Sequence, residues 1–145
     1  MSTIDNGQPD IYLQVPAEMT YLPCIGHFSK ALFTKHPGLQ DREDQLAYNL
    51  ELIVYEACSN VIRHAYAPLQ QGKLELKLWF ENHKIVMQIV DFGPGFSPHD
   101  IPDPDLNNPQ SGGLGLYIIK NIVDHLEYSS NKESQKNILQ LEKKI

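Results

Sequence analysis

Two candidate strand segments lie only four residues apart in this chain, and their spacing constrains the fold more than any other feature. Residues 74–80 alternate leucine and phenylalanine with Glu75, Lys77 and Trp79, and residues 85–91 form the second apolar segment. Alternation with a period of two is typical of strands, and a polar link as short as residues 81–84 favours an antiparallel hairpin. The chain therefore departs from the strict βαβ order of a doubly wound parallel sheet.

Apolar periodicity predicts two helices before this hairpin and one helix after it. His36, Pro37 and Gly38 end the first helix and Pro68 ends the second, because the residue before a proline is disfavoured in the helical conformation. The predicted order is a strand at residues 11–15, helices at about 20–36 and 41–65, strands at 74–80 and 85–91, a helix at 112–125, and strands at 126–130 and 137–143. We therefore expect an α+β fold, a two-layer α/β sandwich with helices on one face of a mixed, mostly antiparallel sheet.

Length and charge limit the functions open to this chain. Its 145 residues suit one ordinary domain, so we expect a single domain over residues 1–145, with residues 1–10 flexible. Twelve Lys and Arg against eighteen Asp and Glu give a net charge of −6 without a basic cluster, which argues against direct nucleic-acid binding. The polar first ten residues and the lack of an apolar run of about 18 residues argue against secretion and membrane insertion, so we expect a cytoplasmic protein.

Metal and nucleotide motifs of other families are missing from the sequence. Cys24 and Cys58 lie within apolar helical patterns and are expected to be buried, and neither they nor the six histidines show zinc-ligand spacing. No phosphate-binding motif of the GxxxxGK[ST] type occurs. Residues 91–93 spell the DFG of protein kinases, but the chain has no HRD loop and is too short for that fold.

A polar row on the long helix is the first candidate site. Glu56, Asn60 and His64 are spaced four residues apart, so they share one side of the helix and drift from its exposed flank toward the apolar face. A carboxylate at Glu56 can accept a proton from a nucleophile, and Asn60 can supply the neutral oxygen ligand that Mg²⁺ takes together with phosphates and water. The structural alternative is a surface glutamate, a half-buried asparagine and a core histidine.

Asp91 ends the second strand of the hairpin and is followed by Gly93 and Gly95. A buried carboxylate there can accept a hydrogen bond from an exocyclic amine such as that of adenine, and two glycines allow the backbone to approach a flat base. A strand exit with a Gly-Pro turn is the plainer interpretation.

A second glycine segment, Gly112-Gly113-Leu114-Gly115, opens the last helix. Helix N-termini hold phosphate through their backbone N–H groups and dipole; a flexible cap with Gly115 allowing close helix packing is the alternative. Residues 96–111, rich in Pro, Asp and Asn, precede it without periodicity, and a stretch of that length is either a functional lid or a disordered loop.

Together these segments resemble the motifs of the Bergerat-fold (GHKL) ATPases, which include gyrase-type topoisomerases, a heat-shock chaperone, sensor histidine kinases and a mismatch-repair ATPase. Residues 56–66, EACSNVIRHAY, resemble the asparagine box; residues 91–96, DFGPGF, the first glycine box; and residues 112–116, GGLGL, the second. The His-Ala-Tyr ending of the first box, the short chain and the GGLGL helix start are similar to the anti-sigma-factor serine kinases of bacterial partner-switching systems.

The resemblance implies a site for ATP and Mg²⁺. Glu56 matches the general base, Asn60 the Mg²⁺ ligand and Asp91 the adenine contact, while residues 96–111 match the ATP lid. Further nucleotide-binding positions are implied at His64, Gly93, Gly95, Gly112, Gly113, Leu114 and Gly115, and Tyr66 also matches a box position.

The resemblance further implies a serine-protein kinase that acts as an anti-sigma factor. Its substrate would be a serine on a small anti-sigma-factor antagonist of the STAS type, and a sigma factor or equivalent regulator would be its other partner. The family's dimerisation through its first strand and helix would involve Ile11, Leu13 and Val15 here.

Two alternatives remain open. One is a nucleotide-gated protein-binding module without efficient phosphotransfer, because a switch needs the same pocket. The other is a histidine-kinase-like ATPase subunit, which is disfavoured because no helix pair with a phosphoacceptor histidine precedes the domain. A gyrase- or chaperone-type ATPase is disfavoured by the lack of a transducer domain.

Overall fold

The computed structural model describes residues 7–40, 45–66, 71–94, 106–107 and 114–145, and these residues form three α-helices and five strands. Along the chain they are β1 (Ile11–Pro16), the 3₁₀ turn η1 (Met19–Tyr21), α1 (Leu22–Lys35), α2 (Leu46–His64), β2 (Lys73–Phe80), β3 (Lys84–Asp91), α3 (Leu114–Ile122), β4 (His125–Asn131) and β5 (Lys136–Lys144). This order confirms the prediction from periodicity.

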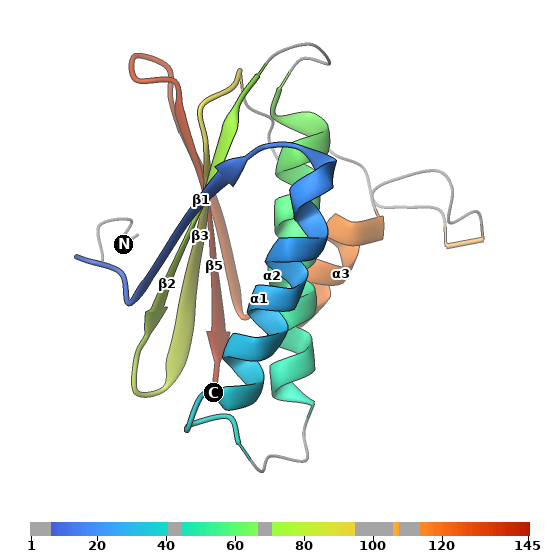
Figure 1. Ribbon diagram of the computed structural model, residues 1–145, viewed down its shortest axis with the longest axis vertical. Coiled ribbons are helices and arrows are strands. Elements are labelled where there is room, and N and C mark those ends of the chain that lie inside the picture. The colour runs from blue at the N-terminus through green and yellow to red at the C-terminus, as the bar shows by residue number, and fades with distance from the viewer. Residues whose placement is uncertain (1–6, 41–44, 67–70, 95–105, 108–113) are drawn as a thin grey trace.

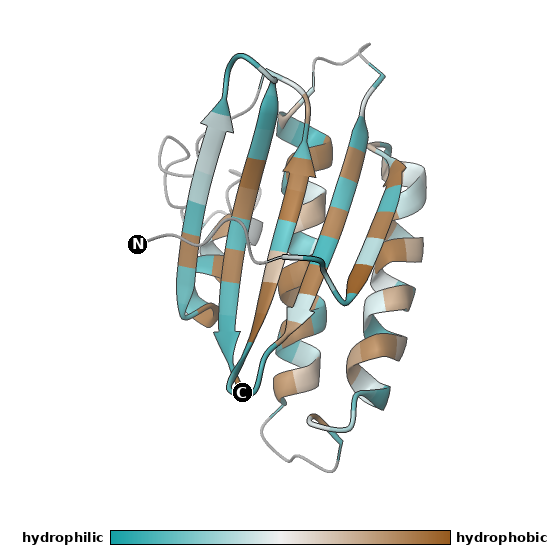
Figure 2. Ribbon diagram, turned by 90° about the vertical axis from the view of Figure 1, so that its left-hand side faces the viewer, coloured by the Kyte–Doolittle hydropathy of each residue, from teal (hydrophilic) through white to brown (hydrophobic). Residues whose placement is uncertain are grey.

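The strands form one sheet in the order β1-β2-β3-β5-β4, and every pair of neighbours is antiparallel. The hairpin of β2 and β3 lies at its centre, as its short link predicted. All three helices cover the same face of the sheet (Figures 1 and 2). The two-layer α+β fold is thus confirmed, and the described sheet is antiparallel throughout rather than mixed.

The core lies between α2 and the central strands. Leu50, Ile53 and Ala57 of α2 are fully buried, as the apolar spacing on that helix predicted. On the sheet, alternate residues of β2, β3 and β5 face the helices, among them Leu76 and Ile89, which are register partners. The central helix is therefore held along its apolar side, and its polar row is left at the edge of the core.

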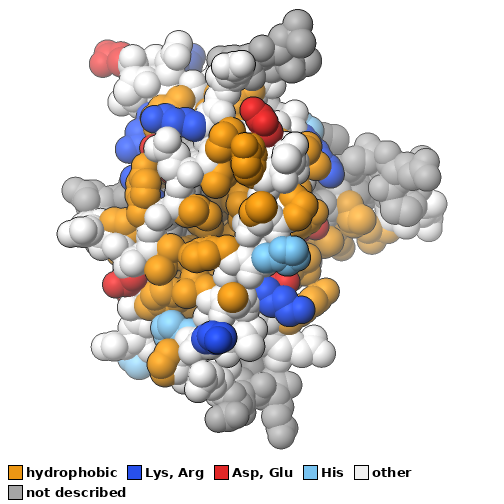
Figure 3. Space-filling model, in the orientation of Figure 1, with side chains coloured by type: hydrophobic (Ala, Val, Ile, Leu, Met, Phe, Trp, Pro, Cys, Tyr) orange, Lys and Arg blue, Asp and Glu red, His pale blue; other side chains and the backbone are white. Residues whose placement is uncertain are grey.

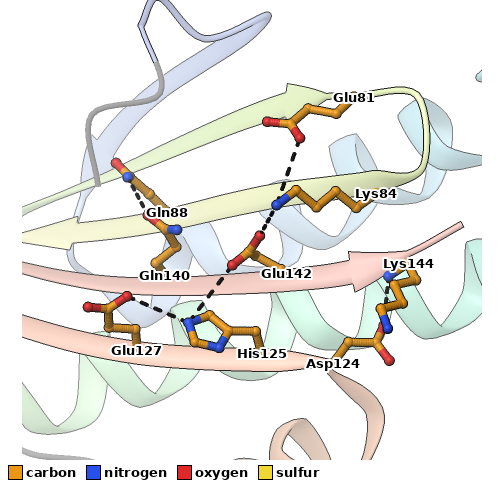
Figure 4. Close-up of polar contacts among 9 residues, drawn as sticks. All are labelled: Glu81, Lys84, Gln88, Asp124, His125, Glu127, Gln140, Glu142 and Lys144. Atoms are coloured by element: carbon orange, nitrogen blue, oxygen red, sulfur yellow. Dashed lines mark hydrogen bonds and ion pairs between the residues drawn. The ribbon is translucent and has the colours of Figure 1, made fainter. Parts of the chain in front are cut away.

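The opposite face of the sheet carries a polar network (Figure 4). Nε2 of Gln88 on β3 donates a hydrogen bond of 2.9 Å to Oε1 of Gln140 on β5. The Lys84 ammonium contacts the Glu142 carboxylate at 2.5 Å. His125 lies 3.9 Å from the same Glu142 carboxylate. Polar pairs of this kind suit a sheet face that has no helical layer against it.

Apolar side chains also lie on the outer surface of the helical layer (Figure 3). Tyr21 of η1, Phe28 of α1, and Tyr48 and Tyr55 of α2 are all exposed. The prediction that Cys24 is buried is wrong: it precedes the buried Ile25 by one residue, about 100° around the helix, and faces outward. Cys58 is buried as expected, and burial raises the pKa of its thiol to about 12.

Two further expectations need refinement. α3 ends at Ile122 rather than near His125, because the backbone N–H of Asp124 donates to Glu142 of β5 and draws the chain into the sheet. Ile11, Leu13 and Val15 of β1 pack against the core of their own chain, so dimerisation through them stays a prediction. Among the described residues, none of the helices has the length and apolar character needed to cross a membrane.

Candidate functional site

Glu56 and Asn60 lie one turn apart on α2, where the polar row meets the core. Asn60 is only 8 % exposed, and its side-chain Nδ2 donates to the backbone oxygen of Glu56 at 2.9 Å. This bond fixes the amide, so Oδ1 is the atom left without a hydrogen bond among the described residues. A buried, oriented carbonyl oxygen of this kind can serve as a neutral ligand to a hard cation.

The Glu56 side chain is half-buried beside Asn60. Burial raises the pKa of its carboxyl above the ordinary value, and the nearby Arg63 guanidinium partly opposes the rise. A carboxylate with a raised pKa is a better proton acceptor than an exposed one. Of the polar row, His64 departs from expectation, because it is exposed rather than turned toward the core.

The N-terminal turn of α3 packs directly against this pair. A Cβ added at Gly115 would lie 2.3 Å from Oε2 of Glu56 and 3.5 Å from Nδ2 of Asn60, so a side chain here would displace the Glu56 carboxylate from its position. The beginning of α3, with its backbone N–H groups and positive dipole end, is thereby placed beside a proton acceptor and an oxygen ligand. These are the groups that a phosphoryl-transfer site needs.

In a phosphoryl transfer that uses these groups, replacing Gly115 by alanine is expected to lower the rate by roughly 10²-fold, since a misplacement of about 1 Å can cost that much. The added methyl group would displace the end of the flexible Glu56 side chain, so the midpoint of thermal unfolding should change little. Gly26→Ala on α1, where the new Cβ would instead contact the Tyr55 ring at 3.3 Å, is the matched control. A Gly115→Ala protein with the wild-type transfer rate would contradict this account of the contact.

Asp91, at the end of β3, is almost completely buried, with 2 % of its surface exposed. One carboxylate oxygen, Oδ1, accepts from the backbone N–H of Gly93 at 3.1 Å and from Nδ2 of Asn137 at 2.8 Å. Burial raises the pKa of Asp91, and these two hydrogen bonds counteract the rise. The second oxygen has no hydrogen bond among the described residues, so it can accept one from a ligand.

Asn137 is a site residue that sequence reasoning missed. It pairs in register with Asp91 across β3 and β5, is 1 % exposed, and its Nδ2 also donates to the backbone oxygen of Gly93 at 2.9 Å. Its own Oδ1 accepts from the Ser130 hydroxyl at 2.6 Å. A signal was present: Asn137 falls in phase with the buried Leu139 and Leu141, and a polar residue on the apolar side of a strand needs a buried partner.

Gly93 is required by packing against the end of α2. A Cβ at this position would lie 2.0 Å from the backbone oxygen of Ala65 and 3.0 Å from Cδ1 of Tyr66. The segment after Asp91 therefore runs directly along the end of α2. Asp91 and Gly93 lie near the C-terminal end of the same helix whose middle carries Glu56 and Asn60.

The remaining predicted positions are less informative. Leu114 is exposed at the start of α3. Gly95, Gly112 and Gly113 lie outside the described residues, as does the predicted lid at residues 96–111 apart from Leu106 and Asn107, which form a turn. An open cavity of about 430 Å³ beside the site is lined by Tyr66, Gln71, Gly72, Lys73 and Phe92, and so does not include the Glu56 and Asn60 pair.

Comparison with known proteins places this geometry in context. Residues 15–143 match the family described as the histidine kinase-like ATPase domain. The serine-protein kinase RsbW of Bacillus velezensis is 26 % identical over 134 residues, which cover 83 % of this chain and 78 % of that protein. The serine/threonine-protein kinase BtrW of Bordetella bronchiseptica is 28 % identical over 99 residues, which cover 65 % of this chain and 70 % of that protein.

A solved structure has the same fold. A chain in the crystal structure of the SiaB–SiaC complex from Pseudomonas aeruginosa superimposes with a TM-score of 0.61, at 15 % identity, over 95 % of this chain and 91 % of its own length. At this identity the likeness concerns the arrangement of helices and strands alone.

Proposed function

The chain belongs to the family of histidine kinase-like ATPase domains, and on that premise we propose that it is an ATP-dependent serine-protein kinase. Its proposed role is that of an anti-sigma factor in a bacterial partner-switching system, where it phosphorylates a serine on an antagonist protein of the STAS type. The names of its relatives RsbW and BtrW support the kinase activity.

The observation that carries the proposal is that α2 contacts two other segments, the start of α3 and the segment after β3, and that each of them brings polar groups suited to a different part of a ligand. The proton acceptor and amide, Glu56 and Asn60, contact the start of α3, while Ala65 at the other end contacts the segment after Asp91. Glu56 and Ala65 are nine positions apart, which corresponds to about 13.5 Å along a helix. A nucleoside triphosphate suits such a site, with its base at Asp91 and its phosphates at Glu56 and the α3 N-terminus.

The donor set fits a magnesium ion bound with the nucleotide. Mg²⁺ prefers oxygen ligands and keeps several waters and phosphate oxygens in its coordination shell. Asn60 offers a buried oxygen whose amide is fixed by its bond to Glu56. When bound, Mg²⁺ would neutralise charge on the phosphates. We therefore propose Asn60 as its protein ligand, with ATP as the phosphoryl donor.

Glu56 is the proposed general base. Its carboxylate takes the proton of the substrate serine hydroxyl as the serine oxygen bonds to the γ-phosphorus and the bond from that phosphorus to the β,γ-bridging oxygen breaks, releasing ADP. The N–H groups at the start of α3 stabilise negative charge on the phosphates. Asp91 binds the exocyclic amine of adenine through its second carboxylate oxygen, which positions the triphosphate relative to Glu56.

The proposed partners are proteins. The exposed apolar side chains of α1 and α2 offer a surface on which a partner can bury area, and the related fold from Pseudomonas aeruginosa was solved as a complex. A sigma factor or equivalent regulator is the proposed alternative partner to the antagonist, and the cytoplasm is the proposed location.

A transfer assay tests the proposal. The protein is incubated with γ-labelled ATP, Mg²⁺ and candidate STAS-type proteins, and the position of the label is determined by phosphopeptide analysis. We expect label on a serine of the cognate antagonist. Tight ATP binding without label on any protein would contradict the kinase and favour a nucleotide-gated binding module, and label on a histidine would favour the histidine-kinase alternative.

A further inference from the structure

Tyr66, two residues beyond the end of α2, connects the two strands of the central hairpin through its hydroxyl group. The hydroxyl donates to the backbone oxygen of Lys73 at 2.6 Å and accepts from the backbone N–H of Phe92 at 2.9 Å. Burial is the main cause that raises the pKa of this tyrosine, so the phenol is protonated at neutral pH and keeps its donor.

The register of the sheet shows which strand pairing this bridge replaces. Leu74 and Asp91 are the last register partners of β2 and β3, so the next pair in the same ladder would be Lys73 and Phe92. Those are the two residues whose backbone groups bond to Tyr66 instead. The Lys73 ammonium still lies 4.8 Å from the centre of the Phe92 ring, so the two residues remain neighbours. The tyrosine hydroxyl thus stands where one ladder hydrogen bond would otherwise form.

Two glycines leave the space that the ring of Tyr66 occupies. A Cβ at Gly72 would lie 2.2 Å from ring atoms Cε1 and Cζ, and a Cβ at Gly93 would lie 3.0 Å from Cδ1. A side chain at Gly72 would displace the ring, and with it the hydroxyl. The chain before β2 and the chain after β3 are therefore both shaped to admit this one side chain.

We propose that Tyr66 is a positioning residue for the nucleotide: its hydroxyl ends the β2–β3 ladder after Asp91 and directs Phe92 and Gly93 toward α2. The inference rests on the proposed ATP site, because the segment that it orients begins with the Asp91 carboxylate. Without the hydroxyl, Phe92 can pair directly with Lys73, β3 gains one residue, and the turn of Gly93 that donates to Asp91 changes direction.

Tyr66→Phe keeps the ring and removes both hydrogen bonds, so it separates positioning from packing. We expect the dissociation constant for Mg²⁺-ATP, measured by calorimetry, to rise about tenfold, the effect of weakening about one hydrogen bond to the nucleotide when the segment that begins with Asp91 is misplaced. The transfer rate at saturating ATP should stay within about twofold of the wild type. The midpoint of thermal unfolding should stay within about 3 °C, because a direct ladder bond replaces the bridge.

Tyr48→Phe on the same helix is the matched control, since that tyrosine is 59 % exposed and should change neither quantity. Unchanged ATP affinity in Tyr66→Phe would overturn the inference, and so would a variant that no longer folds at the assay temperature, because the tyrosine would then serve stability alone. A wild-type protein that fails to bind ATP would instead refute the proposed function, and the inference with it.

Discussion

Replacing Glu56 by alanine is expected to reduce phosphoryl transfer by about 10²- to 10⁴-fold, the usual contribution of a general base, while ATP binding is kept. The carboxylate lies next to Asn60 and the start of α3, where the proposed mechanism requires the substrate hydroxyl to lose its proton. In the proposed site, nucleotide affinity is expected to depend mainly on other groups, Asp91 and the α3 N-terminus. Single-turnover transfer and calorimetry, measured on the same preparation, separate the two effects.

The wild-type pH profile gives an independent check on Glu56. Only the deprotonated carboxylate accepts a proton, and burial raises the pKa of this group. Transfer should therefore fall as the pH drops, with a midpoint above the ordinary pKa of glutamic acid, and Glu56→Gln should lack this limb. Glu51→Ala, at a half-buried position on the same helix, is the control that should leave transfer unchanged. A Glu56→Ala enzyme with near wild-type transfer would remove Glu56 from the mechanism.

Asp91→Asn is expected to weaken ATP binding by about 10²-fold without lowering stability at neutral pH. A hydrogen bond to a charged group contributes about 1.5–3 kcal/mol, and the amide nitrogen that replaces the second oxygen cannot accept from the adenine amine. The amide oxygen can still accept from Gly93 and Asn137, so the local fold should persist. The measurements are calorimetric ATP titration and thermal unfolding.

The sign of the stability effect follows from the pKa shift of Asp91. Because burial raises the pKa in the folded state, folding takes up protons between the unfolded and folded pKa values. Stability then falls as the pH rises through that window, and the penalty persists at neutral pH. The neutral asparagine removes the penalty, so its unfolding midpoint should equal or exceed that of the wild type.

Asp124 provides a control of opposite sign. Its pKa is lowered, chiefly because its Oδ2 accepts a hydrogen bond of 2.6 Å from the backbone N–H of Lys144. Its stabilising effect is present above the unfolded pKa and is lost as the pH falls through the folded one. Asp124→Asn should therefore lower stability slightly at neutral pH and leave ATP affinity unchanged.

If Asp91→Asn binds ATP as tightly as the wild type, the proposed contact between Asp91 and the adenine base is wrong.

The sequence was sufficient to predict the elements because their signals are local. Alternation identified β2, an apolar segment identified β3, and apolar spacing identified α2. The four-residue link between β2 and β3 predicted that they form an antiparallel hairpin. The contact of Gly115 with Glu56 and Asn60 agrees with the motif resemblance, which had grouped these residues. The place of Asp91 at the end of β3 follows from a local signal too, because the apolar segment ends at this residue.

The polar partners could not be predicted in the same way, because they depend on register between distant segments. Asn137 meets Asp91 only through the pairing of β3 with β5, 46 positions apart in the chain. The bridge made by Tyr66 needs the exact point at which the β2–β3 ladder stops. Periodicity also placed Cys24 on the wrong side of α1, since one residue changes the direction of a helical side chain by about 100°.

Calorimetric titration of the wild-type protein with ATP, once with Mg²⁺ and once with EDTA, tests the central claim most directly. That claim is that α2, the start of α3 and the end of β3 together form a nucleotide site. The account predicts saturable binding of one nucleotide per chain that weakens when Mg²⁺ is removed. Absence of saturable binding at millimolar ATP in the presence of Mg²⁺ would contradict it.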